Sequence, residues 1–283
     1  MAIKEKAVVF NCCGKALSGI IHEAENPLSI GVLMIVGGPQ YRVGSHRQFV
    51  MLARYLAKHG VTVFRFDYRG MGDSTGAIQE FEHANADINA AVDVFLNEVK
   101  EIQRLVLWGL CDAASASCFY AAQDERIVGL VLLNPWVRTE KGESEVFLKD
   151  YYLKRFCSWV FWHKLFSGDV NFKSSIVSLS EKVLKVFTKQ SLGETQPTQS
   201  LTLPERMLRS VGQFKHPILF VLSGKDLTAK EFIRLVDTDA KGQALIKREN
   251  VSRVDLPDSD HTFSRDKWKS QVNMATLNWL KAL

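Results

Sequence analysis

Long hydrophobic runs and paired cysteines are both missing from this sequence. Its longest apolar stretches, such as Ile30–Val36 and Ile127–Leu133, are strand-length, whereas a membrane-spanning helix needs roughly 18 apolar residues. The N-terminus lacks the apolar core of a secretory signal, so we expect a cytoplasmic protein without a transmembrane segment. An odd number of cysteines without C-x-x-C spacing argues against a disulfide framework and a zinc site. The five are Cys12, Cys13, Cys111, Cys118 and Cys157.

A strong charge of one sign is absent as well. The formal net charge is +5, which is too small to indicate a nucleic-acid-binding protein. Most of this excess falls in residues 136–212, which hold twelve Lys or Arg against eight Asp or Glu. No metal motif, P-loop or dinucleotide-binding glycine pattern occurs, so we expect no cofactor. What remains is an ordinary globular composition, with 46% hydrophobic residues in a chain of 283.

Short apolar runs alternate with helical periods along most of the chain. This alternation predicts an α/β fold, with a mainly parallel eight-stranded sheet covered by helices on both faces. The first two strands can form an antiparallel hairpin through Gly14. The predicted strands are Ala7–Asn11, Leu17–His22, Ser29–Val36, Val61–Asp67, Leu105–Leu110, Gly129–Leu133, Ile218–Ser223 and Val251–Leu256.

The alternation lapses between residues 136 and 212. Aromatic helical sequence there, including Trp159, Phe161 and Trp162, is followed by a polar stretch at 193–200. We interpret 136–212 as a helical cap inserted into a core formed by 1–135 and 213–283. The excess positive charge of the cap would suit an acyl substrate with an anionic headgroup or carrier. Two other interpretations stay open: the aromatic residues only pack the cap onto the core, or this face contacts an acidic membrane surface.

The strand at 105–110 runs directly into a helix of small residues, and Cys111 lies at the junction. A residue in such an abrupt turn is strained, and the turn needs small neighbours two positions away, which Gly109 and Ala113 supply. The first turn of a helix favours a thiolate. Cys111 is therefore a candidate nucleophile, although a Gly-x-Cys triplet alone also fits a buried structural cysteine.

Asp226 and His261 are the candidate partners of this nucleophile. Asp226 follows a buried strand, and His261 lies in the loop beyond the last strand, so all three side chains belong at one edge of the sheet. Asp258 and Asp260 are alternatives for the acid, and Asn134 excludes a carboxylate after the sixth strand. For His46, His59, His163 and His216 we favour surface or capping roles.

Backbone N–H groups near the nucleophile could form an oxyanion hole. Gly37 and Gly38 follow the third strand, where the backbone can approach a substrate closely. Pro39 has no N–H, so the predicted donors are Gly38 and Asp112, the residue after Cys111. A simple turn is the alternative explanation for the two glycines.

Together these motifs resemble the alpha/beta-hydrolase family. The stretch Asp67–Ser74 also matches that family's D-x-R-G-x-G-x-S signature. The segments 37–47, 66–74, 108–112 and 224–229 are most similar to the exosortase A system-associated hydrolases of bacteria, which implies a link to exopolysaccharide and protein sorting. Two departures stand out: Val36 replaces the common histidine before the glycine, and cysteine replaces serine, as in dienelactone hydrolases.

The resulting hypothesis is acyl transfer through a covalent thioester on a Cys111, Asp226 and His261 triad. Because a thiolate leaves readily, esters, thioesters and lactones are favoured over peptides as substrates. Two alternatives remain open: an acyltransferase that uses the same triad, and a catalytically silent partner protein with this fold. The sequence does not determine the oligomeric state.

Overall fold

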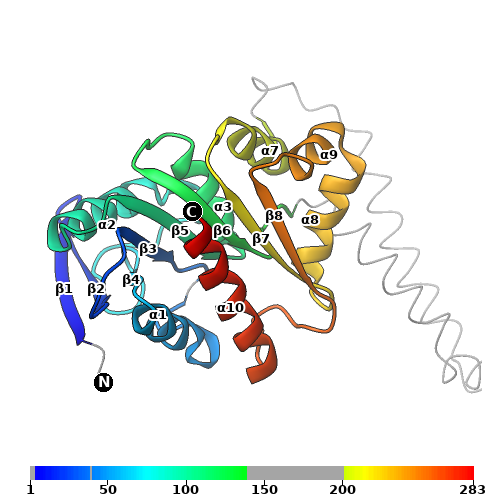
Figure 1. Ribbon diagram of the computed structural model, residues 1–283. Coiled ribbons are helices and arrows are strands. Elements are labelled where there is room, and N and C mark those ends of the chain that lie inside the picture. The colour runs from blue at the N-terminus through cyan, green and yellow to red at the C-terminus, as the bar shows by residue number, and fades with distance from the viewer. Residues whose placement is uncertain (1–3, 39, 139–200) are drawn as a thin grey trace, which may run out of the picture. The chain divides into compact units, whose positions relative to one another are not determined.

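The computed structural model describes residues 4–38, 40–138 and 201–283, which form one eight-stranded sheet with helices on both faces (Figure 1). The strand order is β1-β2-β4-β3-β5-β6-β7-β8. The strands are β1 Lys4–Cys12, β2 Lys15–Glu23, β3 Ile30–Ile35, β4 Thr62–Phe66, β5 Arg104–Leu110, β6 Ile127–Leu133, β7 Ile218–Ser223 and β8 Val251–Leu256. The predicted α/β-hydrolase fold is confirmed, and each predicted strand overlaps one of these eight.

The sheet is antiparallel at one edge and parallel elsewhere. β1 pairs with β2 and β2 with β4 in antiparallel register, and all other neighbouring pairs are parallel. The β1–β2 hairpin turns at Cys13 and Gly14, both of which have positive φ. Every residue of β3, β4 and β7 is buried, which explains the largely apolar sequences of β3 and β7, whereas β4 also buries Thr62 and Arg65.

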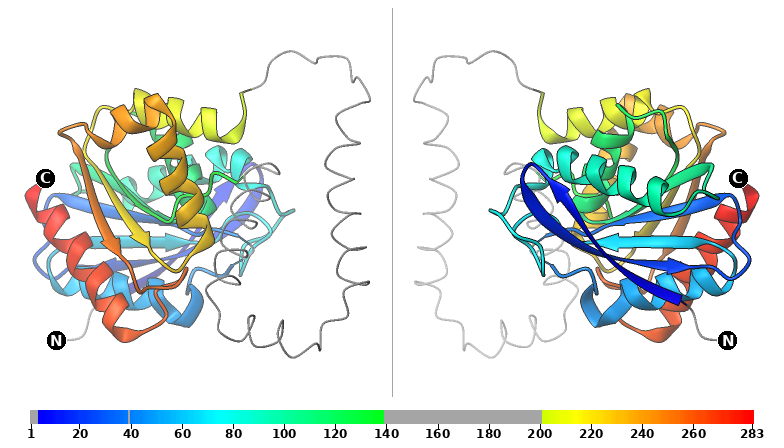
Figure 2. Two further views of the ribbon diagram at one scale, coloured as in Figure 1. Left: turned by 90° about the vertical axis from the view of Figure 1, so that its right-hand side faces the viewer. Right: turned by 90° about the vertical axis from the view of Figure 1, so that its left-hand side faces the viewer.

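The helices divide between the two faces of the sheet. They are α1 Gln48–Lys58, α2 Asn85–Glu98, α3 Asp112–Ala121, α7 Leu203–Gln213, α8 Leu227–Thr238, α9 Ala240–Ile246 and α10 Asp266–Ala282, with short 3₁₀ turns at Ser45–Arg47 and Phe81–His83. α1 and α10 lie side by side on one face, and the others cover the opposite face (Figures 1 and 2). Alternate residues of β3 serve the two cores: Leu33 and Ile35 on one side, Val32 and Met34 on the other.

The compact unit that contains the sheet consists of residues 1–139 and 203–283. The predicted cap at 136–212 falls largely outside the described residues, so its helical character and its role stay predictions. Its last part is different, because α7 contributes Met207, Leu208 and Val211 to the core next to α3. The boundary at 212 stays a prediction, and α7, which precedes it, packs on the core through its apolar stripe.

Candidate active site

Cys111 occupies a strained turn between β5 and α3. Its φ of 65° and ψ of −126° lie in a region that side chains with a Cβ rarely adopt. The turn is held by its backbone, since the Cys111 N–H donates to the Leu133 carbonyl (2.9 Å) and the Cys111 carbonyl accepts from the Trp136 N–H (3.2 Å). A side chain at Gly109 would collide with the Ala113 carbonyl. The small residues therefore let α3 start directly above the strand.

Asp226 follows β7 and its carboxylate is held in place by the start of α8. The side chain is buried, and it accepts hydrogen bonds from the backbone N–H groups of Thr228 (3.3 Å) and Ala229 (3.0 Å) as the helix N-cap. Its Oδ2 lies 2.9 Å from Nδ1 of His261. The helix thus fixes the carboxylate in the position from which it can orient the imidazole.

His261 lies between Asp226 and Cys111 at the carboxyl edge of the sheet. The nearby Asp226 carboxylate and Cys111 thiol raise the pKa of His261 to about 10, although burial of the ring opposes this rise. The ring favours its imidazolium form at neutral pH. The described geometry therefore brings together the three residues that the sequence singled out.

The two alternative carboxylates have other partners. Asp258 is exposed and pairs with the ammonium of Lys225 at 3.2 Å. Asp260 accepts a hydrogen bond from the Ser264 N–H at 2.9 Å and another from its hydroxyl. Of the three carboxylates considered, the ion pair with His261 is made by Asp226.

Asn134 hydrogen-bonds to the loop after β8 that carries His261, a role that the sequence did not reveal. It follows β6 with a φ of 42° and is fully buried. Its amide donates to the Ser223 hydroxyl (2.9 Å) and to the His261 carbonyl (3.0 Å), and accepts from the Ser223 N–H (2.9 Å). The Ser223 hydroxyl in turn donates to the Asp260 carbonyl at 2.9 Å. A buried amide directly after a core strand was the signal available in the sequence.

One of the predicted oxyanion-hole donors, the Gly38 N–H, already bonds a carboxylate of the protein. The Gly38 N–H donates to Oδ2 of Asp112 at 2.8 Å, and the Ala113 N–H donates to Oδ1 of the same carboxylate at 2.9 Å. Burial raises the pKa of Asp112, and these backbone hydrogen bonds partly oppose the rise. The Gly38 and Ala113 N–H groups thus point at the same carboxylate, and this carboxylate belongs to the protein itself.

The loop after β3 is anchored by a buried ion-pair network. The Arg42 N–H donates to Oδ1 of Asp67 at 2.7 Å, and the Arg42 guanidinium contacts both Asp67 and Asp73. Arg65 donates to the Arg42 carbonyl. The D-x-R-G-x-G-x-S motif therefore serves to hold the loop that carries Gly38. Sequence reasoning missed Arg42, although a carboxylate after a buried strand calls for a cation.

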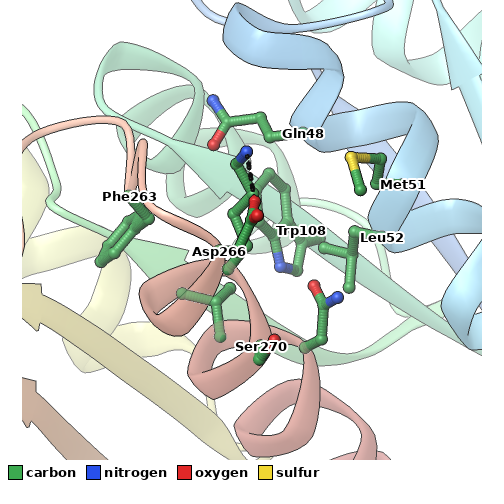
Figure 3. A pocket seen from close by; sticks show the side chains of 10 residues that line it. Gln48, Met51, Leu52, Trp108, Phe263, Asp266 and Ser270 are labelled. Carbon is green, nitrogen blue, oxygen red and sulfur yellow. Dashed lines mark hydrogen bonds and ion pairs between the residues drawn. The ribbon is translucent and has the colours of Figure 1, made fainter.

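A cavity of about 110 Å³ lies between α1 and α10, beside these loops (Figure 3). Trp108 forms its inner wall, and Gln48, Leu52, Phe263 and Ser270 are among the residues around it. Trp108 and Phe263 are close in sequence to Cys111 and His261, yet none of the three candidate catalytic side chains lines this cavity.

The described ranges hold neither a candidate membrane span nor a candidate metal site. In residues 4–38, 40–138 and 201–283, no helix is long and apolar enough to cross a membrane. Over the same ranges, no group of three or more His, Cys, Asp or Glu residues could hold a metal ion.

Comparison with known sequences identifies relatives for most of this chain. The sequence pattern of the family described as serine aminopeptidase S33 matches residues 31–242. A polyketide transferase from a Penicillium species, grgF, is 30% identical over 94 residues, which is 30% of this chain. This matching segment spans 31% of the length of that transferase.

Solved structures of low sequence identity share the fold. The esterase Pf2001 of Pyrococcus furiosus has a TM-score of 0.63 and 17% identity, covering 98% of this chain and 93% of the esterase. Est1E of Butyrivibrio proteoclasticus, solved with ferulic acid bound, has a TM-score of 0.62 and 15% identity, with 98% of each chain covered. The alpha/beta hydrolase GrgF of the Penicillium species has a TM-score of 0.63 and 16% identity, with 99% of each chain covered.

The fold and the family match over residues 31–242 point to the same family. The sheet order, the strained turn at Cys111 after β5 and the loop that carries His261 after β8 all belong to the fold described above. The sequence match covers the sheet from β3 to β7 and continues through α8. This chain belongs to the serine aminopeptidase S33 family of alpha/beta hydrolases.

Proposed function

We propose that this protein is a cysteine-dependent hydrolase that cleaves activated esters, thioesters or lactones through a Cys111, His261 and Asp226 triad. The observation that carries the proposal is the position of His261, whose Nδ1 lies 2.9 Å from Oδ2 of Asp226 and whose pKa is raised by Asp226 and by Cys111 in its strained turn. A nucleophile, a base and an orienting acid are the minimum set for covalent acyl transfer.

The reaction would proceed in two halves. The Cys111 thiolate attacks the substrate carbonyl carbon, a C–S bond forms, and the carbonyl electron pair moves to oxygen. When this pair returns, the alcohol or thiol leaves and takes a proton from the His261 imidazolium. Neutral His261 then removes a proton from water, the resulting hydroxide attacks the thioester, and the Cys111 thiolate leaves. Asp226 orients the ring throughout.

The sulfur nucleophile favours activated carbonyl compounds. A tetrahedral adduct on cysteine expels a thiolate more easily than an amine, so an amide adduct would revert, whereas an ester or thioester adduct goes forward. The fold relatives titled as esterases, one of them solved with ferulic acid, point in the same direction. The resemblance to exosortase-associated hydrolases suggests that the acyl group is linked to exopolysaccharide metabolism in the cytoplasm.

Acyl transfer to an alcohol is the second candidate function. The relative named as a polyketide transferase favours it, because such an enzyme passes its acyl group to an acceptor other than water. Product analysis with and without an added alcohol separates the two functions. Hydrolysis alone gives the free acid in both cases, whereas a transferase gives the new ester when the alcohol is present.

A variant series tests the role of Cys111. We expect Cys111→Ala to lower kcat/KM for p-nitrophenyl and thioester substrates by ~10³-fold or more, because it removes the nucleophile. The exposed cysteine at Cys13 provides the matched control, and Cys13→Ala should keep the wild-type rate. Mass spectrometry of a quenched reaction should find the acyl group on the peptide that contains Cys111.

One outcome would exclude the proposal in favour of a catalytically silent partner protein. If Cys111→Ala turned over substrate as fast as wild type, and iodoacetamide labelled Cys111 no faster than Cys13 at pH 6.5, the triad would have no catalytic role. Labelling of Cys111 that is fast in wild type and slowed in His261→Ala would support the proposal.

A further inference from the structure

The carboxylate of Asp112 accepts a hydrogen bond from the Gly38 N–H, which the proposed reaction needs as an oxyanion donor. We propose that Asp112 is a specificity-determining residue that competes with the substrate for the oxyanion hole, so that only carbonyl compounds able to displace its carboxylate react. This inference rests on the proposed function, because it assigns a competitor to the same site.

The contacts of Asp112 show a cradle shaped for a carboxylate. Both oxygens are bonded, Oδ2 to the Gly38 N–H at 2.8 Å and Oδ1 to the Ala113 N–H at 2.9 Å. Hydrogen bonds from backbone N–H groups to an ionised oxygen are about twice as strong as neutral ones. Gly37 is required for this arrangement, because a Cβ there would collide with Oδ1 of Asp112. The loop after β3 and the first turn of α3 therefore both accommodate this side chain.

The charged surroundings of Asp112 limit where it can go. Two titratable side chains of the described residues interact with it: His261, whose imidazolium attracts the carboxylate, and Tyr68, whose pKa rises mainly by burial and also by the Asp112 charge. In the described part of the chain, the buried Tyr68 hydroxyl has no hydrogen-bond partner. When the Asp112 carboxylate leaves the Gly38 N–H, the imidazolium of His261 and the unpartnered hydroxyl of Tyr68 can therefore interact with it.

Competition for the hole has a chemical consequence. The oxygen of the substrate carbonyl becomes negatively charged and needs the hydrogen bond that the Gly38 N–H donates to Asp112. The ionised carboxylate competes for this hydrogen bond, and the two negative charges repel. Carbonyl groups that readily accept the attacking electron pair, such as thioesters and aryl esters, can meet this demand. Simple alkyl esters form their oxyanion late and at higher energy, so we expect Asp112 to exclude them.

An oxyanion-forming inhibitor measures this competition directly. A long-chain alkyl trifluoromethyl ketone adds to the Cys111 thiolate: a C–S bond forms, the carbonyl electron pair moves to oxygen, and no group leaves. We expect Asp112→Ala to bind it at least about 10-fold more tightly than wild type, because the vacated N–H groups then serve the inhibitor oxygen alone. Asp112→Asn, which is uncharged and of similar size, should fall between the two. Asp93→Asn, which removes a surface carboxylate on α2, is the matched control and should bind like wild type.

The pH dependence adds a readout that a structural role would not move. Burial raises the pKa of Asp112, so protonation as the pH falls should weaken the competitor in wild type only. The affinity advantage of Asp112→Ala should therefore be largest at high pH and shrink toward low pH. Because His261 and Tyr68 are present in both proteins, the ratio isolates Asp112.

The outcomes separate this inference from the proposed function. Equal or weaker inhibitor binding in both Asp112→Ala and Asp112→Asn, with both proteins folded as judged by their melting temperatures, overturns the competition. If those variants bind more weakly while Cys111→Ala is inactive, the triad stands and only the role of Asp112 fails. If Cys111→Ala keeps full activity, the proposed function fails whatever Asp112 does.

Discussion

At the residue scale, the candidate site combines a strained backbone with a matched pair of charges. A non-glycine residue in the conformation of Cys111 costs about 1–3 kcal/mol, which the hydrogen bonds of its N–H and carbonyl offset. The strain turns the sulfur toward the ring of His261. On the other side of the ring, Asp226 is fixed by α8 before any substrate arrives. Preorganisation at this site therefore comes from backbone geometry as much as from the three side chains.

The ion pair between Asp226 and His261 predicts a pH-dependent contribution to stability. The pKa of His261 is raised to about 10, with Asp226 as the first cause, so the pair stabilises the fold fully below the unfolded value of about 6.5. As the pH rises toward 10, the native ring loses its proton and the contribution disappears. In a Cys111→Ala background, which removes the sulfur, Asp226→Asn should therefore cost most stability at pH 6 and least at pH 10.

Urea unfolding of Cys111→Ala with and without Asp226→Asn, between pH 6 and pH 10, measures this difference. Asparagine remains a good helix N-cap, so the variant keeps most of the capping, and the pH-dependent part of the difference reports the ion pair. A difference that stayed constant over the whole range would mean that Asp226 acts only as a cap.

At the element scale, the ends of β6, β7 and β8 are joined through one buried amide. Asn134 links the end of β7 at Ser223 to the His261 carbonyl in the loop after β8. We expect Asn134→Ala to lose about 2 kcal/mol or more of stability, because the Ser223 N–H and the His261 carbonyl stay buried without this partner. We also expect kcat to fall about 10-fold or more, because the histidine loop is no longer fixed against the sheet.

Two further variants separate the causes of these effects. Asn134→Gly removes the same hydrogen bonds but suits the positive φ, so its smaller loss of stability would isolate backbone strain. Asn250→Ala is the matched control: this amide also donates to two carbonyls, of Lys215 and His216, but lies where β7 begins, away from the site. It should lose stability while keeping kcat. If Asn134→Ala kept the wild-type kcat, the positioning role would be excluded.

The strands could be predicted from the sequence, whereas several contacts between the loops could not. Strands such as β3 and β7 were evident because every residue in them is buried, and the three triad candidates followed from lying just beyond strand ends. The support from Asn134 and the place of the Asp112 carboxylate were not evident, because both depend on how separate loops approach one another. The sequence identifies which residues lie at the edge of the sheet, whereas the partners there depend on register and loop geometry.

At the scale of the whole molecule, a group of polar side chains around the buried His22 joins the N-terminal hairpin to the parallel part of the sheet. His22 on β2 is fully buried, and its Nε2 accepts a hydrogen bond from Nε of Arg65 on the neighbouring β4 at 3.0 Å. The other ring nitrogen, Nδ1, lies 3.3 Å from the carboxylate of Glu5. Burial and then the charge of Arg65 lower the pKa of His22 to about 4. This ring is therefore neutral in the native protein over a range in which it would be charged in the unfolded chain.

The lowered pKa of His22 predicts an acid-sensitive fold. Between about pH 6.5 and pH 4 the unfolded chain binds a proton at this position that the native protein does not, so stability falls as the pH falls. At about 1.4 kcal/mol for each pKa unit, the loss attributable to His22 is on the order of 3 kcal/mol. His22→Gln does not titrate in this range and should show a flatter decline in urea unfolding free energy from pH 7 to pH 4. His216→Gln, a change at an exposed histidine, should follow the wild-type curve. Parallel curves for wild type and His22→Gln would instead place the acid sensitivity of the fold in other groups.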